Sequence, residues 1–107
     1  MNQNIKWLQE WYKNQCNSKW EHDYGITIKT LDNPGWSVEI DLEGVEYDET
    51  FQEINIQKSN TDWLKCSIGL NDTWLVHGKK IKQFKASGGW NQLEEIINEF
   101  RKIVQRD

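Results

Sequence analysis

The residues best suited to chemistry in this sequence are a histidine between two carboxylates, Glu21-His22-Asp23. A neighbouring anion favours the imidazolium form, and such pairs serve general-base catalysis. Adjacent residues of a strand point to opposite faces, so His22 cannot easily engage both neighbours if this segment enters a strand. The local sequence also places no Ser, Thr or Cys nucleophile beside it. We therefore predict no catalytic residue here, and expect Glu21 and His22 to stabilise a corner or contact a partner.

Cysteine and metal chemistry are also unsupported. Cys16 and Cys66 have neither metal-ligand spacing nor the pattern of a disulfide framework, and His22 and His77 are not spaced as ligands. The residues flanking each cysteine do not supply the amide cradle and cation that a reactive thiolate needs. We predict no metal and no cofactor, and reduced thiols suit a cytoplasmic protein.

The strongest charge feature is a run of acids in the middle of the chain. Residues 30–57 hold eight Asp or Glu and no Lys or Arg, although the whole chain has 17 acidic and 13 basic residues. Such a surface can attract and steer a basic partner, while the net charge of −4 argues against nucleic-acid binding. An ordinary solvated face is the alternative. The candidate partner-binding acids are Glu39, Asp41, Glu43, Glu46, Asp48 and Glu49.

These acids are positioned by a predicted β-hairpin over residues 25–44. Apolar and polar residues alternate along both of its strands, which indicates one buried and one wet face. On the second strand this alternation places Glu39, Asp41 and Glu43 on the outer face, about 7 Å apart along the strand. The residues expected to face inward there are Trp36, Val38, Ile40 and Leu42.

The turn of this hairpin and its aromatic neighbour form a second candidate contact. Pro34 and Gly35 predict a type II turn, with Gly35 at the position that requires a positive φ. The chain has seven Trp, a residue type that is seldom fully buried and often anchors partners. We expect Trp36, and with it Trp20, to contact a partner. The strand alternation equally allows Trp36 a place in the core.

The flanking segments predict an α+β fold for a single domain, residues 1–107: an N-terminal helix, an antiparallel meander of about five or six strands and a C-terminal amphipathic helix packed on the sheet. The lysine-rich segment 78–85 is expected at a sheet edge, where lysines hinder unwanted pairing. Asn91 and Glu94 resemble a capping box for the last helix. The helices are expected at 4–17 and 91–104, and further strands at 45–57, 64–70 and 74–76.

No apolar run approaches the length of a membrane span, and the N-terminus has no export signal, so we expect a cytoplasmic protein without membrane contact.

Four segments carry a resemblance to a known family: WLQEWYKNQC at 7–16, WEHDYGITIKTLDNPGWSVEIDLEG at 20–44, DWLKC at 62–66 and LEEIINEF at 93–100. Together they resemble the immunity protein 53 family of bacterial polymorphic toxin systems, and the block 20–44 is the most specific part. The resemblance implies a small cytoplasmic protein, made beside a toxin gene, that binds its toxin and blocks it without chemistry.

The residues and the resemblance together predict that the chain neutralises a cognate toxin, such as a nuclease with a basic cleft, by direct binding through the candidate acids, Trp36 and Trp20. The alternative is a small enzyme or ligand-binding domain that uses an open sheet face around Glu21, His22 and Asp32. A third option is an interaction domain without a toxin partner. The sequence does not predict an oligomeric state.

Overall fold

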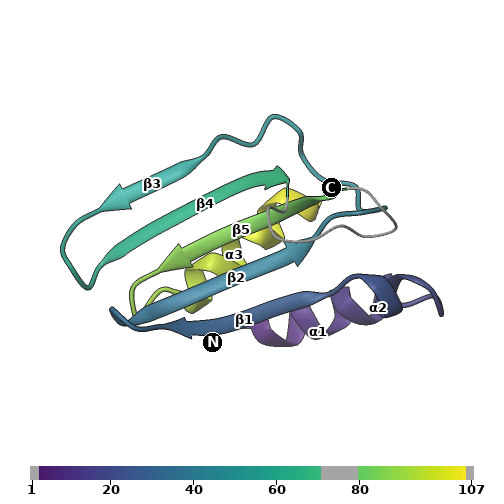
Figure 1. The fold of residues 1–107 in the computed structure, drawn as a ribbon, viewed down its shortest axis with the longest axis horizontal. Helices are drawn as coiled ribbons and strands as arrows, with labels where there is room; N and C mark the ends of the chain where they lie inside the picture. The colour runs from purple at the N-terminus through teal and green to yellow at the C-terminus, as the bar shows by residue number, and fades with distance from the viewer. Residues whose placement is uncertain (1–2, 71–79, 106–107) are drawn as a thin grey trace.

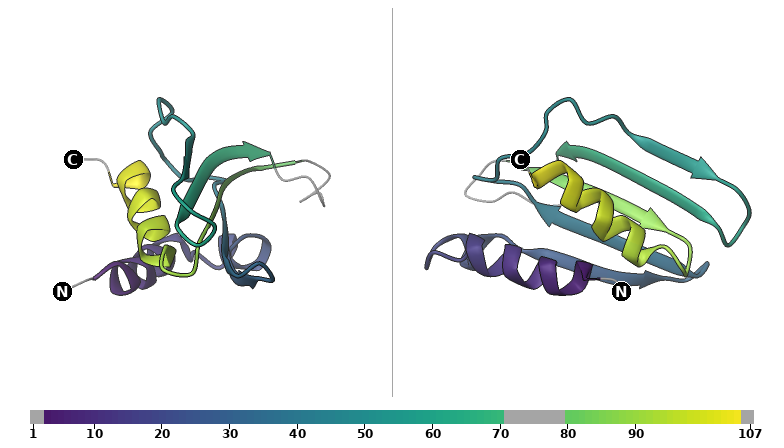
Figure 2. Two further views of the ribbon diagram at one scale, coloured as in Figure 1. Left: turned by 90° about the vertical axis from the view of Figure 1, so that its left-hand side faces the viewer. Right: turned by 180° about the vertical axis from the view of Figure 1, so that it is seen from behind.

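A computed structural model describes residues 3–70 and 80–105 of the chain. It shows one antiparallel sheet of five strands with the two longer helices on one face, and the other face open (Figures 1 and 2). Seen from behind, both helices lie in front of the sheet. The predicted α+β fold is confirmed. Its elements are α1 (Asn4–Gln15), α2 (Trp20–Asp23), β1 (Ile26–Leu31), β2 (Gly35–Asp41), β3 (Ile54–Gln57), β4 (Trp63–Leu70), β5 (Lys82–Gly88) and α3 (Leu93–Val104).

The strands follow the order β1-β2-β5-β4-β3, which differs from that of a meander because β5 lies between β2 and β4. The expectation of an edge strand in the lysine-rich segment 78–85 is therefore wrong. Phe84 and Ala86 of β5 are buried in the core, and β5 forms ladders with β2 on one side and β4 on the other. A strand paired on both sides has no free edge for lysines to protect. The strand expected at 74–76 lies outside the described residues.

The core lies between the sheet and the helices. α3 buries one stripe, as its sequence predicts, and this stripe is formed by Ile96, Ile97, Phe100 and Ile103. The Phe100 ring lies 5.2 Å from that of Phe84 on β5 and 4.9 Å from that of Trp11 on α1, measured between centroids. Phe100 therefore joins the sheet to both helices. Aromatic pairs at such separations add to the free energy gained from burial alone.

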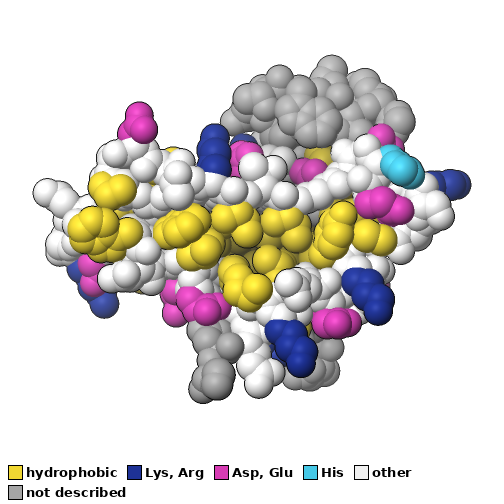
Figure 3. Space-filling model, turned by 90° about the horizontal axis from the view of Figure 1, so that it is seen from below, with side chains coloured by type: hydrophobic (Ala, Val, Ile, Leu, Met, Phe, Trp, Pro, Cys, Tyr) yellow, Lys and Arg dark blue, Asp and Glu magenta, His cyan; other side chains and the backbone are white. Residues whose placement is uncertain are grey.

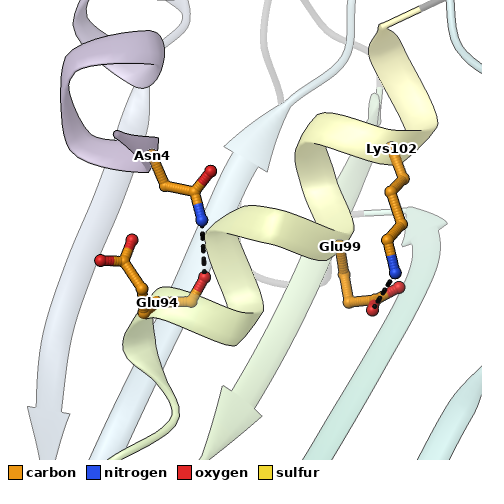
Figure 4. Close-up of polar contacts among 4 residues, drawn as sticks. All are labelled: Asn4, Glu94, Glu99 and Lys102. Carbon is orange, nitrogen blue, oxygen red and sulfur yellow. Dashed lines mark hydrogen bonds and ion pairs between the residues drawn. The ribbon is translucent and has the colours of Figure 1, made fainter. Parts of the chain in front are cut away.

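A polar contact fixes the start of α1 against the start of α3 (Figure 4). The side-chain amide of Asn4 donates to the backbone oxygen of Glu94 at 3.3 Å, and Arg101 donates to the side-chain oxygen of Asn4 at 3.3 Å. The expected capping box is wrong, because α3 begins after Gln92 and no side chain caps it. Farther along α3, Lys102 pairs with Glu99 at 3.1 Å.

The hairpin is confirmed, but its turn differs from the expected one. Leu31 pairs directly with Gly35, so Gly35 belongs to β2 and the loop consists of residues 32–34. Within the described residues the only glycine with a positive φ is Gly44. Gly35 is required for another reason: a Cβ atom there would collide with the backbone oxygen of Gly88 on β5. The close approach of two strands, and not the turn, selects this glycine.

This packing makes a testable prediction for Gly35→Ala. The added methyl group should force β2 and β5 apart and lower the free energy of unfolding by about 1–3 kcal/mol, the usual cost of overpacking. Urea denaturation followed by circular dichroism measures the change. Gly69→Ala is the matched control, since Gly69 also lies in a strand but has open space around its Cβ position. Equal unfolding midpoints for the two variants would contradict the assignment.

Candidate functional site

Strand β2 alternates as predicted. Val38, Ile40 and Leu42 point to the helix layer and are almost fully buried. Glu39 lies on the open face, where it is half-buried.

Asp41 departs from the expected row of exposed acids, because only 6% of its surface is exposed. One carboxylate oxygen accepts the backbone N–H of Gly25 at 2.9 Å, and the other accepts the side-chain amide of Gln83 at 2.8 Å. The carboxylate thus joins the start of β1 to the start of β5. A buried carboxylate is retained where hydrogen bonds replace its hydration. Asp41 is therefore a structural residue in the folded protein and does not offer its carboxylate to a partner.

The open face of the sheet is mixed in charge. Glu39 lies opposite Thr27 of β1 and Lys85 of β5 in the strand register, and Lys85 donates to the backbone oxygen of Leu70 at 2.9 Å. A shallow hollow of about 370 Å³ on this face is lined by residues that include Glu39, Lys85 and Lys65. The expected acidic strand face is thus interrupted by lysines from neighbouring strands.

A denser group of acids lies in the segment that follows β2, where Lys82 of β5 lines the same hollow as Asp48, Glu49 and Glu53. We call residues 46–53 the acidic loop; its exposed carboxylates belong to Glu46, Asp48, Glu49 and Glu53. This segment leads from the end of β2, in the interior of the sheet, to β3 at the edge (Figure 1). Glu43, just before it, is half-buried, and its backbone oxygen accepts the indole N–H of Trp20 at 2.9 Å.

The acidic loop is held in place by both apolar and polar contacts. Tyr47 and Phe51 pack against the core, which turns the acids between them outward. The backbone N–H of Asp48 donates to the oxygen of Ile103 at 2.9 Å, near the C-terminus of α3. The Asp48 carboxylate accepts the hydroxyl of Thr50 at 2.6 Å. These contacts order the loop before any partner arrives, which reduces the entropy lost on binding.

The two predicted aromatic contacts differ in exposure. Trp20 is buried at 7% exposure and packs edge-on against Trp11, so the expectation that it faces a partner is wrong. Trp36 is half-buried against the core, and its indole N–H donates to the backbone oxygen of Trp90 at 3.0 Å. Sequence reasoning missed Trp90, which is 56% exposed. The available signal in the sequence was that Trp90 follows two glycines and precedes the last helix, outside any periodic pattern of apolar residues.

The structure does not bring together the residues of the alternative enzyme or ligand-binding site. Glu21 and His22 lie in the short helix α2 before β1, and Asp32 follows the last residue of β1, so they lie at opposite ends of a six-residue strand, roughly 20 Å apart. Residues 20–23 also form a helical turn and not the expected strand entry.

Glu21 has a structural role in this corner. Its carboxylate accepts the backbone N–H groups of Asn17 and Ser18, both at 2.9 Å. Backbone N–H donors, first its own and then those of Asn17 and Ser18, hold the pKa of Glu21 below its usual value. A carboxylate engaged in this way stabilises the turn before α2 and is a poor general base.

Comparison with known proteins decides the family. A family model described as Immunity protein 53 matches residues 5–105. The chain belongs to the immunity protein 53 family. A search of curated proteins and a search of solved structures find no match. Membership of an immunity-protein family implies that the chain neutralises a toxin, and proteins of this kind are generally inhibitors without catalytic activity.

Burial, and then the carboxylates of Glu99 and Glu95, raise the pKa of Cys66 to about 12, so its thiol is a poor nucleophile. Within residues 3–70 and 80–105 no three His, Cys, Asp or Glu side chains are grouped as metal ligands. The helices of that same part of the chain are too short or too polar to cross a bilayer.

The structural role of Asp41 is testable. Asp41→Ala should leave the Gly25 N–H and the Gln83 amide without their partner and lower the free energy of unfolding by about 1–3 kcal/mol. Chemical denaturation provides the measurement. Glu49→Ala, at an exposed acid of the acidic loop, should change stability by less than about 0.5 kcal/mol. A similar small change in both variants would mean that the Asp41 contacts add nothing to stability.

Proposed function

We propose that this immunity protein neutralises its cognate toxin by direct binding, and that the acidic loop forms the main contact with a basic toxin surface. The observation that supports this most strongly is the exposure of four carboxylates on a loop whose backbone is anchored to the core and to α3. An ordered cluster of one charge sign steers an oppositely charged partner and fixes its orientation.

A nuclease with a basic substrate cleft is the class of toxin that this charge fits best, because such a cleft normally receives phosphates. Neutralisation would then follow from occupation of the cleft, with no reaction on the toxin. Glu39 adds a further carboxylate on the open face, although it lies beside Lys85 in the register.

Trp36 and the exposed Trp90 offer a second contact at the hairpin end of the sheet. β2 separates this pair from the acidic loop by roughly 20 Å, because its seven residues each rise about 3.3 Å. An interface of standard size, about 800 Å² on each partner, is wide enough to include both. Aromatic anchors of this kind often dominate the binding energy, whereas surrounding charges set the association rate.

The proposal predicts the effect of Glu46→Gln with Glu49→Gln on the kinetics of binding to the purified toxin domain encoded by the neighbouring gene. Loss of two loop charges should slow association about tenfold at low salt and flatten its dependence on ionic strength. The matched control is Glu10→Gln with Glu95→Gln, which removes two exposed charges from α1 and α3. If both double variants associate equally fast, the acidic loop does not guide the toxin.

A further inference from the structure

The outer edge of β1 carries a row of backbone hydrogen-bonding groups without a partner strand. β1 is the first strand in the sheet order, and nothing in the described part of the chain pairs with its outer side. The backbone oxygen of Gly25 accepts from the N–H of Asp41 on β2. In an antiparallel ladder such pairs recur at every second residue, so Ile26, Ile28 and Thr30 direct their N–H and C=O groups outward.

An apolar stripe accompanies this edge. Figure 3, which looks at the molecule from the β1 side, shows hydrophobic side chains in a continuous band along its middle, with charged side chains on both flanks. The most exposed large apolar residues of β1 and α1 are Ile28, Ile5 and Tyr12, at 39%, 49% and 41% exposure. An unpaired edge with an apolar surface beside it is a site for strand pairing, unless charge or irregularity blocks it.

We propose that a second copy of this chain pairs with β1 about a two-fold axis, so that the two sheets join into one. In this register Ile28 of one copy faces Ile28 of the other. Ile26 of each copy then faces Thr30 of the other copy, and all three outward-facing residues have hydrogen-bond partners. A two-fold interface requires a surface that complements itself, and three outward residues centred on Ile28 satisfy this requirement.

The side chains also fit this register. On the helix face the two Ile28 side chains meet, and the apolar stripes of the two copies become continuous across the axis. On the open face Lys29 lies opposite Thr27 of the second copy, so its charge does not face a like charge. A strand of unrelated sequence would not in general place an isoleucine opposite Ile28 and a threonine opposite Lys29. These pairings favour a second copy over a foreign strand as the occupant.

This surface is separate from the acidic loop, the main contact proposed for the toxin, whereas Trp36 of the second proposed contact lies on the strand beside Thr30 of β1. The acidic loop leads from β2 across the end of the sheet to β3, away from the outer edge of β1. Pairing through β1 therefore leaves both acidic loops of the dimer accessible, and the two proposals can fail independently.

Sedimentation equilibrium of the full chain, up to about 0.1 mM, tests the pairing. At that concentration a micromolar dissociation constant leaves most chains paired. We expect twice the chain mass for the wild type. Ile28→Lys, which sets two ammonium groups against each other on the axis, should weaken pairing about tenfold or more.

The matched control is Ile56→Lys, which changes an isoleucine of similar exposure on the opposite edge strand, β3, and should leave the mass doubled. A monomeric wild type would overturn the proposal, and so would equal dissociation of the two variants. Circular dichroism verifies that each variant is folded.

A second measurement does not depend on a disruptive substitution. Facing Cα atoms in a hydrogen-bonded antiparallel pair lie about 5.5 Å apart, so a short bifunctional thiol reagent can join two cysteines placed there. In a Cys16→Ser background, Ile28→Cys should give a covalent dimer with this reagent, whereas Ile56→Cys should not. Failure of Ile28→Cys to cross-link in a chain that sediments as a dimer would place the interface elsewhere and overturn the proposal.

Discussion

The pairing of β2 with β5 decides where the other elements of this protein lie. It brings residues that are far apart in the sequence into one register, in which Ile40 faces Phe84 and Val38 faces Ala86. These four side chains belong to the buried core cluster that also contains the apolar stripe of α3. The same pairing fixes the Asp41–Gln83 hydrogen bond and the close approach of Gly35 to Gly88. Each of these features depends on the pairing of β2 with β5.

The central position of β5 also shapes the charge distribution. Because β1 and β5 occupy the two places beside β2, and β4 lies beyond β5, the chain must cross the end of the sheet to form β3 at the far edge. The crossing segment contains four of the eight exposed acids of the described residues, and its aromatic residues pack against the core. The proposed toxin contact is therefore a consequence of topology. Glu39 stays on β2 and faces Lys85 of β5, whereas the acids of the crossing segment are gathered outside the strand ladders, with Lys82 beside them.

Local patterns in the sequence predicted much of this fold but little of its long-range pairing. Alternation at Val38, Ile40 and Leu42 and the helical stripe of α3 were sufficient to place the buried faces. The burial of Asp41 and Trp20 was not predictable in this way, because it depends on partners that are distant in sequence. Asp41 bonds to Gln83, and Trp20 contacts the Glu43 backbone and the ring of Trp11. Gly35 was recognised as special for the wrong reason, since its constraint comes from a strand that is distant in sequence.

The most direct test of the account is co-expression of this chain with the toxin domain encoded by the neighbouring gene, scored by survival of the host and by co-purification. Neutralisation by direct binding predicts survival together with a stable complex of the two proteins. Survival without a complex would contradict the account, because protection would then require chemistry on the toxin or its product. Absence of both would show that this chain does not neutralise that toxin.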